Sequence, residues 1–130
     1  MMKNDKAKTL LIVDDDQVLL RMLESRLRAE GYHVRSTYEA AVGLQMVMDT
    51  PPDLIVLDVM MPIINGYNFC RLLKKECGER VKGIPVVFLT SRDDPEDKQI
   101  GMEMGADRYL TKPLNMEDLL KVIEDLLRRD

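Results

Sequence analysis

Five side chains that can take part in chemistry stand at or directly after short apolar segments of the chain. In sequence order they are Asp14, Asp15, Asp58, Thr90 and Lys112. Carboxylates gathered in one crevice repel one another, and this repulsion is relieved by protonation or by a bound cation. All-oxygen ligands suit a hard cation such as Mg²⁺ or Mn²⁺. A metal, a carboxylate, a hydroxyl group and a lysine together supply what phosphoryl transfer requires.

Each of these residues also has an ordinary structural interpretation. Acids before a helix commonly cap it, and we expect this role for Asp16, which follows the first two. A single Asp or Thr at the end of a strand is usually a turn residue. The pattern favours a joint site only because all five positions follow expected strands.

The expected strands come from the apolar runs. Continuous runs at 10–13, 54–57 and 86–89 predict strands that are buried on both faces of a parallel sheet. Two more polar segments, 32–37 and 107–111, predict outer strands. Helical patterns alternate with these segments, so we predict a doubly wound α/β fold with the ligand site at the carboxyl ends of the strands.

Helix boundaries are marked by capping and breaking residues. The expected starts are Asp16, a capping box at Ser36-x-x-Glu39, Asn65, Asp94-Pro95 and Asn115. The expected ends include Gly31, Pro51-Pro52 and Gly105.

Composition narrows the class of protein. The chain has 130 residues with 19 Lys and Arg against 23 Asp and Glu, a net charge of -4, which fits one domain and disfavours nucleic acid as a direct partner. No apolar run reaches a membrane span and no signal peptide is evident, so we expect no membrane contact and a cytoplasmic location. The single histidine, His33, leaves little room for a histidine-based catalytic triad.

The sequence resembles the receiver domain of two-component response regulators, including the stand-alone chemotaxis type. The segments that carry the resemblance are 11–16, 52–62, 85–91 and 105–113. The resemblance implies a flavodoxin-like, five-stranded parallel sheet of order 2-1-3-4-5 with five helices. It also leads us to expect a single receiver domain over 1–130, with its core at about 8–129 and no output domain.

The resemblance implies a role for each site residue. Asp58 corresponds to the phospho-acceptor, which takes its phosphoryl group from a sensor histidine kinase or a phosphotransfer protein. Asp14, Asp15, Asp58 and the backbone carbonyl of Met60 would bind Mg²⁺, for which Mn²⁺ can substitute. Thr90 and Lys112 would contact the phosphoryl oxygens, and Lys112 would pair with Asp58 before phosphorylation.

The same resemblance implies a switch. Tyr109 stands at the family's switch position and would rotate inward when Thr90 turns toward the phosphate. This movement would reshape the face formed by the helix expected at 94–104, the strand at 107–111 and the last helix, where a downstream protein binds. We expect a monomer or a phosphorylation-dependent dimer. Met60 and Arg92 occupy positions that modulate access of water, and their bulk predicts a phosphate that lasts longer than that of the chemotaxis regulator.

Two other classes of protein fit parts of the pattern. The segment from Asp14 to Val18 matches the nucleophile motif of haloacid-dehalogenase-like phosphatases, although the acids after Lys112, such as Asp118 and Asp125, fall within a helical pattern. An adaptor that keeps only the fold is the second alternative. The intact acidic set disfavours it.

Overall fold

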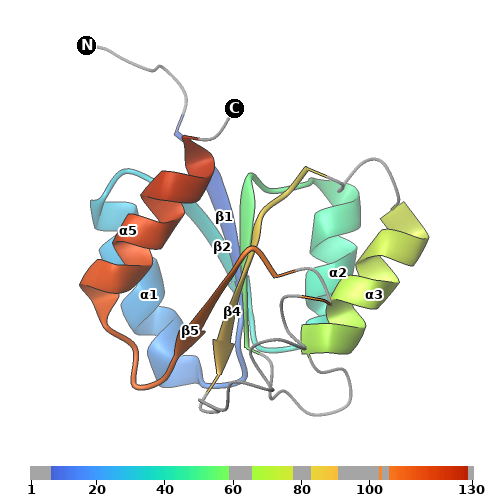
Figure 1. The fold of residues 1–130 in the computed structure, drawn as a ribbon, viewed down its shortest axis with the longest axis horizontal. Coiled ribbons are helices and arrows are strands. Elements are labelled where there is room, and N and C mark those ends of the chain that lie inside the picture. Colours follow the sequence, from blue (N-terminus) through green and yellow to red (C-terminus); the bar gives the residue numbers. More distant parts are fainter. Residues whose placement is uncertain (1–6, 59–65, 78–82, 91–102, 104–105, 129–130) are drawn as a thin grey trace.

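The computed structural model describes residues 7–58, 66–77, 83–90, 103 and 106–128, with no side-chain placement for 66, 67 and 74–77 (Figure 1). In this part of the chain five strands form one parallel sheet of order β2-β1-β3-β4-β5. The strands are β1 (Thr9–Val13), β2 (His33–Thr37), β3 (Leu54–Asp58), β4 (Val86–Thr90) and β5 (Arg108–Thr111). The predicted strands and their order are confirmed.

The sheet is covered by helices on both faces. The described helices are α1 (Gln17–Ala29), α2 (Ala40–Asp49), α3 (Gly66–Cys77) and α5 (Met116–Leu127). Helices α1 and α5 cover one face, and α2 and α3 cover the other (Figure 1). The helix expected between Asp94 and Gly105 lies, except for Glu103, outside the described residues.

The central strands β1, β3 and β4 carry continuous apolar runs because each of their faces meets a helical layer. Alternate residues of β1 divide between two core clusters: Leu11 and Val13 pack toward α2 and α3, whereas Leu10 and Ile12 pack toward α1 and α5. All four are fully buried. Burial on both faces explains why these strands read as continuous apolar runs.

Several capping predictions are confirmed. The Asp16 carboxylate accepts a hydrogen bond from the Leu19 N–H at 3.1 Å, and the Asn115 side chain accepts one from Asp118 at 3.1 Å. Gly31 ends the first helical segment with a φ of 101°, a backbone conformation that favours glycine.

The predicted capping box at Ser36 and Glu39 is wrong. Ser36 belongs to β2, and its hydroxyl group donates a hydrogen bond to the Glu24 carboxylate on α1. Glu39 is the residue before α2, but its side chain caps nothing. Because β2 extends through Thr37, Ser36 cannot reach the start of α2. Asn65 and Asp94, the other expected helix starts, lie outside the described residues.

Helix α2 packs unusually close to the sheet at Gly43. A Cβ atom there would lie 3.0 Å from Val13 Cγ2 and 3.2 Å from Phe69 Cε2. The missing side chain lets the helix approach β1, the strand that leads into the acidic segment.

No described helix combines the length and apolar character needed to cross a bilayer.

Candidate acidic site at the ends of the strands

The sheet register brings the predicted site residues to one edge. Val13 pairs with Leu57, so the next residues, Asp14 directly after β1 and Asp58 at the end of β3, lie side by side. Thr90 ends β4 and pairs with Thr111, the residue before Lys112. Parallel strands place all their carboxyl ends at one edge, so side chains far apart in sequence meet there.

Three carboxylates converge at this edge. Asp14, Asp15 and Asp58 each offer one oxygen, and these oxygens all lie within 4.8 Å of one another. Asp14 is fully buried and Asp58 is 4% exposed, whereas Asp15 is open to solvent. The group therefore combines two buried carboxylates with one that faces solvent.

Lys112 places a positive charge between the two buried acids. Its Nζ lies 3.0 Å from Asp14 Oδ2 and 3.5 Å from Asp58 Oδ2. The backbone N–H of Lys112 donates a hydrogen bond to the Thr90 carbonyl at 2.7 Å, which fixes Lys112 against β4. Burial alone lowers the pKa of Lys112, but attraction to Asp14 and then to Asp58 outweighs that effect and raises it above its ordinary value of 10.5.

The surroundings of Asp14 fit a bound cation. Its Oδ1 accepts a hydrogen bond from the Asp16 N–H at 2.9 Å. Its Oδ2 is buried and lies 3.0 Å from the Lys112 ammonium, which is its charged partner. Three carboxylates against one ammonium also leave an excess of negative charge. A hard divalent cation such as Mg²⁺ matches this excess of negative charge and the all-oxygen set of ligands.

The remaining predicted residues divide between the described and undescribed parts. Thr90 is fully buried at the end of β4. Tyr109 is half-buried on β5, with its ring centroid 6.5 Å from that of Phe88. Met60 and Arg92 lie outside the described residues, so their predicted roles stay predictions.

One contact of the site was missed by sequence reasoning. Pairing of Lys112 with Asp58 was expected, but the shorter distance is to Asp14. No sequence pattern marks this contact, because it joins the ends of β1 and β5, which are not neighbours in the sheet.

A parallel doubly wound sheet with three carboxylates at the carboxyl ends of its strands fits a receiver-type signalling domain, and comparison with known proteins agrees. The family model described as the response regulator receiver domain matches residues 10–124. The chain therefore belongs to the response regulator receiver domain family, and the resemblance seen in the sequence is confirmed.

Individual relatives support this assignment. The response regulator ArlR of Staphylococcus aureus (strain Mu50) is 39% identical over 120 residues, which cover 92% of this chain and 52% of that protein. A putative response regulator from Chloroflexus aurantiacus superposes with a TM-score of 0.88 at 37% identity, covering 95% of this chain and 100% of the other. Chemotaxis protein CheY4 of Vibrio cholerae superposes with a TM-score of 0.86 at 30% identity, covering 93% of this chain and 99% of the other.

The chain spans about half the length of the curated relatives that it matches. These comparisons therefore describe the receiver domain.

Proposed function

We propose that Asp58 accepts a phosphoryl group from a phosphohistidine of a sensor histidine kinase or phosphotransfer protein. The observation that carries the proposal is the position of the Asp58 carboxylate: nearly buried at the end of β3, beside two other carboxylates and 3.5 Å from the Lys112 ammonium. The carboxylate oxygen attacks phosphorus, the P–N bond breaks, and the imidazole leaves with the electron pair and takes a proton. An ionised carboxylate needs no general base for this attack.

Asp14, Asp15 and Asp58 would hold Mg²⁺, with Mn²⁺ able to substitute. By family resemblance the Met60 carbonyl would join them. When bound, the cation offsets the negative charge of the carboxylates and of the phosphoryl oxygens. The excess negative charge of three carboxylates beside one ammonium supports this assignment.

Lys112 and Thr90 bind the phosphoryl oxygens in this proposal. The Lys112 ammonium already lies between Asp14 and Asp58, so a phosphoryl group on Asp58 comes within its reach. Thr90 is the last residue of the neighbouring strand β4, and its side chain supplies a hydroxyl group. The same pocket would admit the water that later removes the phosphate, with Met60 and Arg92 limiting its access.

The output of the domain would be a change of surface. Tyr109 is half-buried on β5, where it pairs with Phe88, two residues before Thr90 on β4, so movement of Thr90 would act close to it. Rotation of its ring would alter the face that includes β5 and α5, where a downstream protein binds. Dimerisation through this surface on phosphorylation is the alternative output.

The phosphatase alternative requires Asp14 as the nucleophile and further acids in a loop. Asp14 Oδ1 is held by the Asp16 N–H and Oδ2 faces Lys112, and neither oxygen is exposed. Asp118 and Asp125 lie within α5. The position of these two acids in a helix, and not in a loop, disfavours the phosphatase alternative.

Incubation with Mg²⁺ and acetyl phosphate distinguishes the candidates. A receiver gains one phosphoryl group and loses this ability on Asp58→Asn, whereas a phosphatase shows many turnovers that depend on Asp14. An adaptor that keeps only the fold is labelled neither by this donor nor by a kinase, and that result would contradict the proposal.

A further inference from the structure

Each oxygen of the Asp14 carboxylate has a partner within the chain. Oδ1 accepts a hydrogen bond from the Asp16 N–H at 2.9 Å, and Oδ2 lies 3.0 Å from Lys112 Nζ. Asp14 also belongs to the three carboxylates whose oxygens lie within 4.8 Å of one another, the group assigned above to Mg²⁺. A cation that binds Asp14 therefore meets a side chain that a lysine already engages.

The two partners of Asp14 differ in how easily they can be exchanged. The Asp16 N–H belongs to the backbone at the start of α1, where the Asp16 carboxylate accepts a hydrogen bond from the Leu19 N–H at 3.1 Å. The Lys112 ammonium ends a long side chain that is 23% exposed, and it has a second carboxylate partner, Asp58, at 3.5 Å. Oδ2 is therefore the oxygen of Asp14 that can change its partner.

Electrostatic repulsion sets a divalent cation against the ammonium at this carboxylate. Asp14 is fully buried, so water screens its surroundings poorly, and two positive charges on one carboxylate repel each other there. The acidic group as a whole can hold both charges. Three ionised carboxylates beside one ammonium leave an excess of two negative charges, which equals the charge of one divalent cation. We therefore expect the cation and the ammonium to divide the carboxylates between them.

We propose that Lys112 competes with the divalent cation for the Asp14 carboxylate, and that binding of the cation shifts the ammonium toward Asp58. The inference rests on the proposed function, because it takes Asp14, Asp15 and Asp58 as the cation ligands. It adds a regulation of that site, since the cation and the ion pair of Asp14 with Lys112 weaken each other. The shift moves the ammonium toward the carboxylate proposed to carry the phosphoryl group, so the cation prepares the pocket for its substrate.

The test measures the affinity of the full chain for Mg²⁺ by titration calorimetry at fixed pH and ionic strength. We expect Lys112→Met to bind Mg²⁺ about tenfold more tightly than the unsubstituted chain, because the competing charge is gone. A purely structural role of Lys112 predicts the opposite, since a pocket that has lost a supporting contact binds its ligand less tightly. If Lys112→Met does not fold, Lys112→Gln replaces it with the same expected gain.

Two variants serve as controls for charge. Lys121→Met removes the same charge from the exposed side of α5, and its affinity for Mg²⁺ should stay within about twofold of the unsubstituted chain. Lys112→Arg keeps a positive charge in the pocket, and its affinity should lie closer to that of the unsubstituted chain than to that of Lys112→Met.

A second measurement follows the lysine itself. The ¹⁵N resonance of the Lys112 ammonium should shift saturably with Mg²⁺, at the same midpoint as binding, because the ammonium exchanges Asp14 for Asp58. The resonance of Lys121 should not shift.

Equal or weaker binding of Mg²⁺ by Lys112→Met would overturn the inference. So would an equal gain in Lys121→Met, which would reveal only an effect of net charge, or a Lys112 resonance that does not move at saturating Mg²⁺. Each of these results leaves the phospho-acceptor proposal intact, because phosphorylation of Asp58 is measured separately by mass. Absence of Mg²⁺ binding by all of the proteins would instead contradict the metal assignment on which the inference rests.

Discussion

The Lys112 ammonium lies 3.0 Å from Asp14 Oδ2 and 3.5 Å from Asp58 Oδ2, so a single positive charge serves two buried carboxylates from different strands. Asp14 follows β1, Asp58 ends β3 and Lys112 follows β5. This arrangement joins the ends of the interior strands β1 and β3 to the end of the edge strand β5. The stability of the domain and its chemistry are therefore linked through Lys112.

Replacing Lys112 by Met should destabilise the domain when no divalent cation is present. The substitution leaves two buried carboxylates without their counter-charge, which we expect to lower the free energy of unfolding by about 2 kcal/mol, less than for a fully buried pair because the lysine side chain is 23% exposed. Urea unfolding measures the change. Lys121→Met, on the exposed side of α5, is the control and should have little effect.

Mg²⁺ should recover part of this loss, because a cation that binds only the folded state stabilises it. Equal stability of Lys112→Met and the unsubstituted chain without Mg²⁺ would show that the ion pair contributes nothing.

Alkaline pH should weaken the same interaction. The pKa of Lys112 is raised above 10.5 in the folded state, so its stabilising contribution is fully present below 10.5 and is lost as pH rises through the folded pKa. The unfolding free energy should therefore fall more steeply above pH 10.5 in the unsubstituted chain than in Lys112→Met. Parallel curves for the two proteins would rule out this origin.

Gly43 should resist enlargement. In Gly43→Ala the new methyl group would lie 3.0 Å from Val13 Cγ2 and 3.2 Å from Phe69 Cε2, so the neighbours must move. Alanine also favours the helix over glycine by about 1 kcal/mol, but we expect the close contacts to cost more than this gain. The free energy of unfolding should therefore fall by about 1 kcal/mol, as measured by thermal or urea unfolding. Gly83→Ala, where nothing lies within 4 Å of the added Cβ, is the matched control. A Gly43→Ala protein more stable than its parent would contradict the close packing.

Much of the fold could be predicted because its causes are local. The runs that became β1, β3 and β4 are apolar on both faces, and the structure extends each by only one residue. Asp16 and Asn115 cap helices as expected, since a cap depends on residues two or three positions away.

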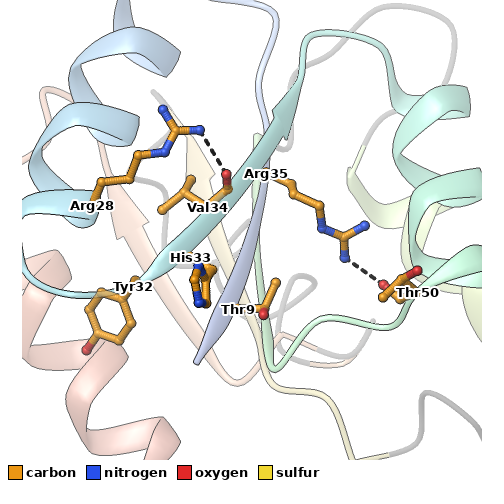
Figure 2. A pocket seen from close by; sticks show the side chains of 7 residues that line it. All are labelled: Thr9, Arg28, Tyr32, His33, Val34, Arg35 and Thr50. Atoms are coloured by element: carbon orange, nitrogen blue, oxygen red, sulfur yellow. Dashed lines mark hydrogen bonds between the residues drawn. The ribbon is translucent and has the colours of Figure 1, made fainter. Parts of the chain in front are cut away.

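The errors and omissions depend on tertiary structure. Ser36 has the spacing of a capping box, but the pairing of β2 with β1 holds it in a strand and turns its hydroxyl group to Glu24. The contact of Lys112 with Asp14 depends on the order of the strands and on side-chain direction. The cavity beside the first residues of β1 and β2 is lined by Arg28, His33 and Thr50 from separate elements (Figure 2), and their spacing in the sequence does not indicate that they lie together.

The central claim is that Asp58 is the phospho-acceptor, and intact-mass measurement after treatment with acetyl phosphate and Mg²⁺ tests it most directly. Asp53→Asn is the matched control, because Asp53 lies just before β3 and is exposed, whereas Asp58 ends the same strand and is buried. We predict the mass of one phosphoryl group on the unsubstituted chain and on Asp53→Asn, and none on Asp58→Asn. Equal labelling of Asp58→Asn, or no labelling of any of the three proteins by this donor or by a histidine kinase, would contradict the account.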